Sequence, residues 1–129
     1  MKRLAAVILI LAMLCGGAWA DTGSDVVDAA KLYLELMYLA YERNPEFVFG
    51  YVDEIFSYTL LYFAGESIKG VERNKALGHD SGLLIDGYAM VVSDLGNRYN
   101  EYRSGEMTLE EYMTKLMSVV KIFVHDNYK

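Results

Sequence analysis

The two histidines of this chain are the side chains best suited to metal chemistry, because an aspartate follows each of them directly. The pairs are His79-Asp80 and His125-Asp126. Imidazole and carboxylate together form a workable ligand set for zinc, copper or nickel. In an up-down-up-down bundle the start of the third helix and the end of the fourth lie at the same end. Three further aspartates near the start of the first helix would join that end: Asp21, Asp25 and Asp28.

Each histidine also has a purely structural interpretation. His125 falls near the C-terminus of a predicted helix, where the helix dipole favours a positive charge. His79 falls in a polar connection. No metal-ligand spacing such as His-Glu-x-x-His strengthens the metal interpretation. We therefore expect no bound cofactor and keep a metal site as the alternative.

The sequence does not indicate nucleophilic catalysis. Residues 65–69 read Gly-Glu-Ser-Ile-Lys, which lacks the final glycine of a nucleophile elbow, and no strand is predicted before them. The chain has no phosphate-binding loop, no dinucleotide fingerprint and no Cys-x-x-Cys-His haem attachment motif. These patterns predict a protein that is not an enzyme.

The first twenty residues have the three-part layout of a secretory signal peptide. Met1-Lys2-Arg3 is basic, residues 4–14 form an unbroken apolar run, and Ala18-Trp19-Ala20 is a small-x-small ending. We expect cleavage after Ala20, a signal peptide at 1–20 and a single helical domain at 21–129. The mature protein would then lie in the periplasm or be secreted.

Two other interpretations of the N-terminus stay open. Cys15 could carry a lipid, although Leu14 is not the small residue that lipoprotein processing prefers before the cysteine. The apolar run could also remain as an uncleaved anchor, although it is short for a spanning helix. If the signal is removed, Cys15 leaves with it, and no disulfide can form within the mature chain. No later segment is apolar enough for a transmembrane span.

The mature chain is acidic. It keeps ten of the twelve basic residues and all eighteen acidic ones, which gives a net charge of about −8. Such a surface repels nucleic acid and anionic lipid headgroups, so we expect no nucleic-acid partner. An acidic surface favours a basic protein partner, or it only keeps the protein soluble.

Tyrosine is unusually frequent, with all eleven residues after Asp21. A tyrosine ring has a large apolar body and a polar tip, so it suits both core edges and binding surfaces. We expect some rings to line the core. The candidate partner surface consists of aromatic residues predicted to face outward: Tyr51, Tyr58, Tyr99 and Tyr128.

Apolar residues at three-four spacing predict an all-α fold, a small bundle of four main helices. The first begins at the cap Ser24 and ends near Arg43, and Asn44-Pro45 starts the second. The second helix has a wide apolar stripe, so we expect it to be the most buried helix. The stripe consists of Val48, Val52, Ile55, Phe56, Thr59, Leu60, Tyr62 and Phe63.

The later helices have clearer boundaries. The third begins near Asp80 or Ser81 and ends by Gly105. Thr108 and Glu111 form a capping box that starts the fourth. Between the second and third helices, residues 65–78 contain three glycines and a polar run, so we expect a long connection there.

The C-terminal tail resembles the periplasmic b-type four-helix cytochromes. Their His-x-x-Tyr-basic pattern is matched by His125, Tyr128 and Lys129. The resemblance implies haem binding, with His125 as a ligand. The family's other ligand is a methionine near the start of the first helix, where this chain has Val26 and Val27.

Two segments resemble the small exported helical immunity proteins of type VI secretion, the Tai family. Residues 47–52 are similar to that family's Gly-Tyr-Val helix start, and residues 107–112 to its Thr-Leu segment before the last long helix. The family usually has disulfide cysteines, which the mature chain lacks. The resemblance implies a periplasmic, non-enzymatic protein that binds a partner, such as a toxin. We therefore predict an exported partner-binding protein, with a haem- or metal-binding bundle as the alternative.

Overall fold

The computed structural model describes residues 24–126, which form helices and short turns. The elements are α2 (Ser24–Arg43), α3 (Pro45–Phe49), α4 (Val52–Leu77), α5 (Gly82–Ser104), α6 (Leu109–Val120) and the π-helical turn η2 (Lys121–His125). No strand occurs in this part of the chain, and the predicted all-α bundle of four main helices is confirmed. The predicted signal peptide, Cys15, Asp21 and Tyr128 lie outside the described residues.

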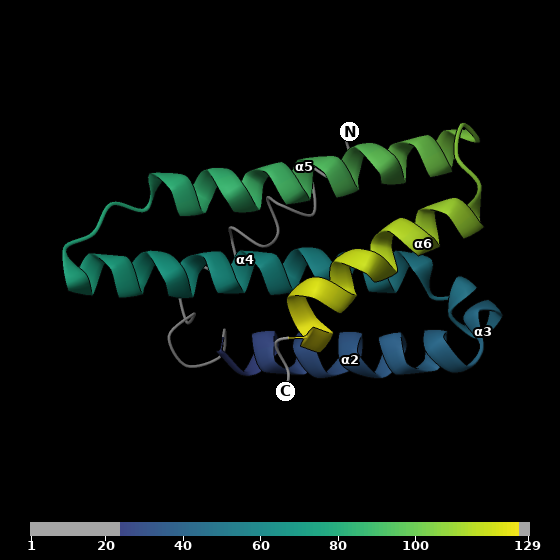
Figure 1. The fold of residues 1–129 in the computed structure, drawn as a ribbon, viewed down its shortest axis with the longest axis horizontal. Coiled ribbons are helices and arrows are strands. Elements are labelled where there is room, and N and C mark those ends of the chain that lie inside the picture. Colours follow the sequence, from purple (N-terminus) through teal and green to yellow (C-terminus); the bar gives the residue numbers. More distant parts are fainter. Residues whose placement is uncertain (1–23, 127–129) are drawn as a thin grey trace.

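The long helix α4 is the centre of the bundle (Figure 1). Helix α2 packs along one side of it, and α5 packs along another. Helix α6 crosses the bundle obliquely and contacts α2, α4 and α5. The turn η2 then ends against α2. Within 24–126 no helix is both long and apolar enough to span a membrane.

The core sits where α2, α4 and α6 meet. All eight residues of the predicted stripe from Val48 to Phe63 are buried, as the sequence predicts. Tyr112 of α6 is fully buried, and its ring stacks on Tyr102 at a centroid distance of 5.7 Å. Burial of this kind supplies most of the stability of a bundle without disulfides.

The predicted long connection at 65–78 is wrong, because α4 continues through it to Leu77. The two interior glycines serve close packing between helices. A Cβ atom at Gly65 would collide with Val27 of α2, and a Cβ atom at Gly70 would collide with Leu84 of α5. Glycine is unfavourable in a helix by about 1 kcal/mol, so here tertiary packing overrides local propensity.

The predicted second helix is two elements. Asn44 and Pro45 begin a helix as expected, but α3 lasts only to Phe49. The chain then turns at Gly50 and Tyr51, and α4 starts at Val52. This turn lets α3 cap the end of the bundle while α4 runs back along α2.

The ends of α5 and α6 follow the sequence signals. Helix α5 ends at Gly105, whose φ of 89° is left-handed and suits glycine. The capping box is confirmed: Glu111 N–H donates to the Thr108 hydroxyl at 3.1 Å, and Thr108 N–H donates to the Glu111 carboxylate at 3.0 Å. Helix α6 therefore begins where the sequence predicts.

The last part of α4 and the first part of α5 extend past the start of α2 as a two-helix arm (Figure 1). We call residues 69–90 the arm. The turn at its tip uses Gly78, whose φ is 74°. Among the described residues, α2 and α6 do not cover the arm along its length, and Leu83 is strongly exposed there.

Candidate functional site

The structure brings two of the predicted surface tyrosines together at the start of α4. Tyr51 is 40% exposed and Tyr58 is 37% exposed. Two aromatic residues that the sequence did not single out join them, Phe47 of α3 and Tyr33 of α2. We call these four residues the aromatic surface.

The aromatic surface contains two ring contacts, one within each of two pairs. The Tyr33 and Tyr58 rings lie at a centroid distance of 4.3 Å with a tilt of 36°. The Phe47 and Tyr51 rings lie at 5.6 Å with a tilt of 40°. These contacts fix the rings before any partner binds, and Phe47 remains 53% exposed. The face is therefore both preorganised and accessible.

The hydroxyl of Tyr33 is enclosed and has no hydrogen-bond partner among the described residues. Burial, followed by the charge of Glu54 and the neighbouring Tyr58 and Tyr51, raises the pKa of Tyr33 to about 12. The group therefore stays protonated at any physiological pH. An enclosed hydroxyl without a hydrogen-bond partner is unfavourable for the fold.

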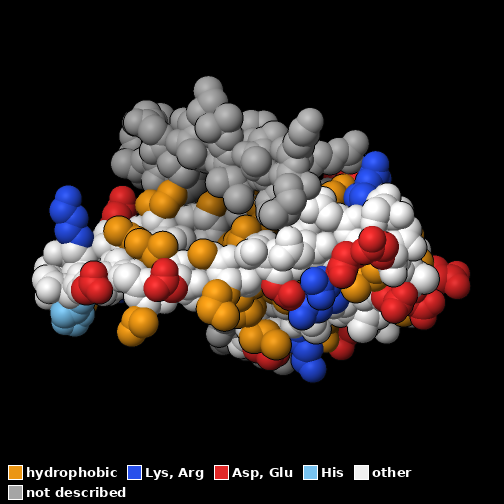
Figure 2. Space-filling model, turned by 90° about the horizontal axis from the view of Figure 1, so that it is seen from above, with side chains coloured by type: hydrophobic (Ala, Val, Ile, Leu, Met, Phe, Trp, Pro, Cys, Tyr) orange, Lys and Arg blue, Asp and Glu red, His pale blue; other side chains and the backbone are white. Residues whose placement is uncertain are grey.

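The aromatic surface lies in an acidic part of the chain. Residues 42–58 contain four acidic side chains and one basic side chain, namely Glu42, Glu46, Asp53, Glu54 and Arg43. Seen from above, acidic side chains gather at the end of the molecule where α3 and the α5–α6 turn lie (Figure 2). The chemistry of the site is thus aromatic contact bordered by negative charge.

Tyr99 does not belong to this surface, which corrects the prediction. It is 5% exposed, its ring stacks on Phe56 at 4.2 Å, and its hydroxyl donates to Asp53 at 2.6 Å. Tyr99 follows the buried Leu95 by one helical turn, so it shares the inward face of α5. The four-residue spacing between Leu95 and Tyr99 was the sequence signal that could have shown this, because it predicts that Tyr99 is buried.

The predicted metal residues are not gathered into one site. His79 and Asp80 are exposed at the α4–α5 turn, at the tip of the arm. His125 and Asp126 lie at the end of η2, which ends over α2 rather than beside the arm (Figure 1). From 24 to 126 no group of three or more His, Cys, Asp or Glu side chains is placed to hold a metal ion. The prediction assumed an up-down-up-down bundle, but α6 crosses the bundle obliquely and the arm carries the α4–α5 turn past the start of α2.

His125 has a different partner, which the sequence did not reveal. Its Nδ1 lies 2.8 and 2.9 Å from the two carboxylate oxygens of Glu35, a residue that is only 9% exposed. The ring also packs on Tyr38 at 4.6 Å. The Tyr62 hydroxyl donates to the Phe123 carbonyl at 2.9 Å. These contacts fasten the π-helical turn to α2 and α4, so His125 here has a structural role.

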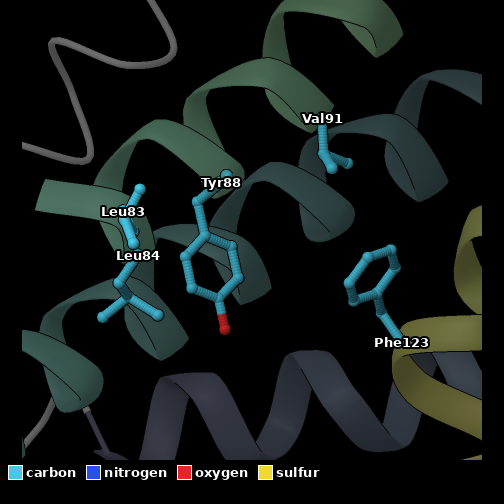
Figure 3. A pocket seen from close by; sticks show the side chains of 6 residues that line it. Leu83, Leu84, Tyr88, Val91 and Phe123 are labelled. Atoms are coloured by element: carbon cyan, nitrogen blue, oxygen red, sulfur yellow. The ribbon is translucent and has the colours of Figure 1, made fainter. Parts of the chain in front are cut away.

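A second surface feature is an apolar hollow beside α5 (Figure 3). Its volume is about 290 Å³, and it is lined by Leu83, Leu84, Gly87, Tyr88, Val91 and Phe123. The lining contains no charged group and only one hydroxyl. The hollow can therefore hold apolar groups but offers little to orient a polar substrate.

Comparison with known proteins identifies no relative: no family model, no curated protein and no solved structure matches the chain. The resemblances to the Tai family and to the four-helix cytochromes stay predictions.

Proposed function

We propose that this protein is an exported, non-enzymatic binding protein whose aromatic surface receives a basic face of another protein. The observation that carries the proposal is two aromatic ring pairs, Tyr33–Tyr58 and Phe47–Tyr51, in which all rings but the half-buried Tyr33 are exposed, within an acidic region.

The aromatic rings would supply the contact area. Tyrosine and phenylalanine bring a large surface with few rotatable bonds, so ordering them at an interface costs little entropy. The ring contacts between Tyr33 and Tyr58 and between Phe47 and Tyr51 already limit that freedom. Leu36, which is 56% exposed one turn after Tyr33 on α2, extends the apolar area.

The acidic border would select the partner. Glu46 and Glu54 are exposed and form no ion pair with another described residue. Lysine or arginine side chains of a partner can pair with them and lie over the tyrosine faces. Complementary charge mainly raises the association rate and the specificity, and salt weakens it.

An inhibitor-like role fits this mode of action. A small bundle that covers a basic site on a toxin or enzyme needs shape, charge and stability, and needs no catalytic group of its own. The export signal expected at residues 1–20 would bring the protein to the compartment where it meets such a partner.

The test compares partner binding by the mature protein with binding by a Tyr51→Ala/Tyr58→Ala variant. The partner is first recovered by affinity capture from the compartment where the protein accumulates and is then purified. We expect the variant to bind this purified partner about tenfold more weakly or worse, since central aromatic residues dominate binding energy. Leu77→Ala, which removes a 61%-exposed side chain at the far end of α4, is the matched control.

Charge provides an independent arm of the test. Glu54→Lys should slow association, and added salt should weaken wild-type binding. Equal affinity of the wild type and the double tyrosine variant would reject the aromatic surface. A partner whose binding is unaffected by salt and by Glu54→Lys would reject the basic-partner proposal.

A further inference from the structure

The outward side of α2 carries an apolar stripe of its own, opposite the stripe that packs in the core. Its leucines are Leu32, Leu36 and Leu39, which are 48%, 56% and 43% exposed. They follow one another at spacings of four and three, as in the contact line of a coiled coil. Helix α2 lies at the edge of the bundle, with no other described helix beyond it (Figure 1). A helix that is apolar on opposite sides is normally buried on both.

The stripe continues at the same spacing to both ends of α2, where it becomes charged. We call the whole line the seam, and it consists of Asp25, Ala29, Leu32, Leu36, Leu39 and Arg43. All of these residues are exposed. Within residues 24–126, neither Asp25 nor Arg43 forms an ion pair. The seam is therefore apolar in the middle, with a negative charge at one end and a positive charge at the other.

Two copies of the seam are complementary when they run in opposite directions. An antiparallel pair that sets Leu32 against Leu36 of the second copy also sets Asp25 against Arg43 of the second copy. Each contact occurs twice, because a twofold interface is self-complementary. In the same register Ala29 meets Leu39, so a small side chain faces a large one. A parallel pair would instead set Asp25 against Asp25 and Arg43 against Arg43, which is repulsive.

The two flanks of the seam differ in charge. One flank carries Asp28 and Glu42, and both have contacts within their own chain. Lys69 lies 4.0 Å from Asp28, and the Tyr38 hydroxyl donates to Glu42 at 3.3 Å. The other flank carries no charge and consists of Val26, Tyr33 and Ala40. A second helix can therefore lean toward the uncharged flank, away from the acidic one.

We propose that α2 binds a second copy of this chain as an antiparallel, twofold-symmetric helix pair along the seam. The leucines of the two copies interdigitate in the middle, and the Asp25–Arg43 pairs close both ends. Helix α2 has 20 residues and is about 30 Å long. One pair of such helices is a small interface for a specific complex. We therefore expect a reversible dimer that forms as the concentration rises.

The dimer does not rest on the proposed function. Leu36 borders the aromatic surface, so a second copy and a partner of the aromatic surface would compete for it. Asp25 and Arg43 lie outside the aromatic surface, and variants at these two positions leave its four rings unchanged. Failure of the dimer and failure of partner binding are therefore detected with different variants.

The first experiment measures the mass of the mature protein by sedimentation equilibrium over a range of concentrations. We expect a concentration-dependent dimer for the wild type. Leu36→Glu should weaken the dimer by about tenfold or more, because it places a charge in the middle of the apolar contact. Leu36 is exposed in one copy, so the helical circular dichroism should stay unchanged. Leu83→Glu is the matched control, because Leu83 is 89% exposed on α5 and lies outside the seam. This control should dimerise like the wild type.

Charge reversal at the ends of the seam tests the direction of the pair. Asp25→Arg and Arg43→Asp should each weaken the dimer by about tenfold, since each variant alone sets like charges together at both ends. An equal mixture of the two variants should associate about as tightly as the wild type, because each end then joins an arginine to an aspartate. Both native charges also favour the dipole of α2. Mixing leaves each chain's own helix unchanged, so a change in helix stability cannot produce this recovery.

Three results would count against the proposal. A wild type that stays monomeric at all concentrations would overturn the dimer. A dimer that survives Leu36→Glu but is lost in Leu83→Glu would place the contact on α5 and overturn the assigned interface. Charge variants that fail to associate when mixed, while the wild type dimerises, would overturn the antiparallel register.

Discussion

At the scale of single residues, the contact between Glu35 and His125 joins two largely buried polar side chains of α2 and η2. The Nδ1 atom of His125 lies 2.8 Å from a Glu35 carboxylate oxygen and donates a hydrogen bond to it in the tautomer that carries the hydrogen on Nδ1. Both side chains are largely buried, with 12% and 15% of their side-chain areas exposed. Removing one partner leaves the other buried without a hydrogen bond, and that cost exceeds the net value of the contact.

We expect His125→Ala to lower the free energy of unfolding by about 2 kcal/mol, because it strands the Glu35 carboxylate. Urea melts followed by circular dichroism measure the loss. The Glu35→Leu/His125→Ala double variant removes both polar groups and should recover part of that stability. If His125→Ala melts like the wild type, the π-helical turn does not depend on this contact.

At the scale of elements, the packing of helix α4 depends on the side chains that contact its glycines. The Gly65→Ala substitution would raise local helix propensity by about 1 kcal/mol. It would also press a methyl group onto the stiff, branched side chain of Val27. Overpacking of this kind costs about 1–3 kcal/mol, so we expect a net loss of stability.

The matched control is Gly87→Ala, because its added methyl group would meet open space. Both substitutions are compared with the wild type in urea melts followed by circular dichroism. Gly87→Ala should then stabilise slightly, and Gly65→Ala should destabilise. Adding Val27→Ala to Gly65→Ala should relieve the clash. Stabilisation by Gly65→Ala alone would show that α2 and α4 pack less closely than described.

The elements also show how far the sequence alone could predict this structure. The capping box at Thr108 and Glu111 was predictable because both partners lie within one turn. The buried stripe of α4 was predictable because periodicity reports a helix face. The continuation of α4 past Gly65 was not predictable. Its interior glycines are needed for close contact with Val27 and Leu84, which lie on other helices.

The candidate site was predictable only in part, for the same reason. Tyr51 and Tyr58 could be proposed as surface residues because the sequence predicts that both face outward from one helix. Tyr33 joins them from α2, and its contact with Tyr58 exists only in the folded chain. Glu35 and His125 are ninety residues apart in the sequence, so their contact was equally invisible.

At the scale of the whole molecule, the buried and half-buried tyrosines link folding to alkaline pH. Burial is the largest cause that raises the pKa of Tyr33 and Tyr62, each to about 12. Burial likewise raises the pKa of Tyr38, Tyr88 and Tyr112. In the unfolded chain a tyrosine ionises near pH 10. Because the folded pKa is the higher one, this stability is fully present below pH 10 and is lost as the pH rises toward 12.

We therefore expect alkaline titration to proceed in two phases. Tyrosinate absorbance should first rise reversibly as exposed rings ionise, and then rise cooperatively as the helical circular dichroism is lost. At neutral pH, Tyr62→Phe should destabilise by about 1 kcal/mol through loss of the hydrogen bond to the Phe123 carbonyl. It should also make the alkaline loss of stability less steep, because one group with a raised pKa is gone. Tyr51→Phe, which changes an exposed ring, is the control and should leave the cooperative phase unchanged. A single gradual rise near pH 10 with the helices intact would contradict the burial of these rings, and with it the core that positions the aromatic surface.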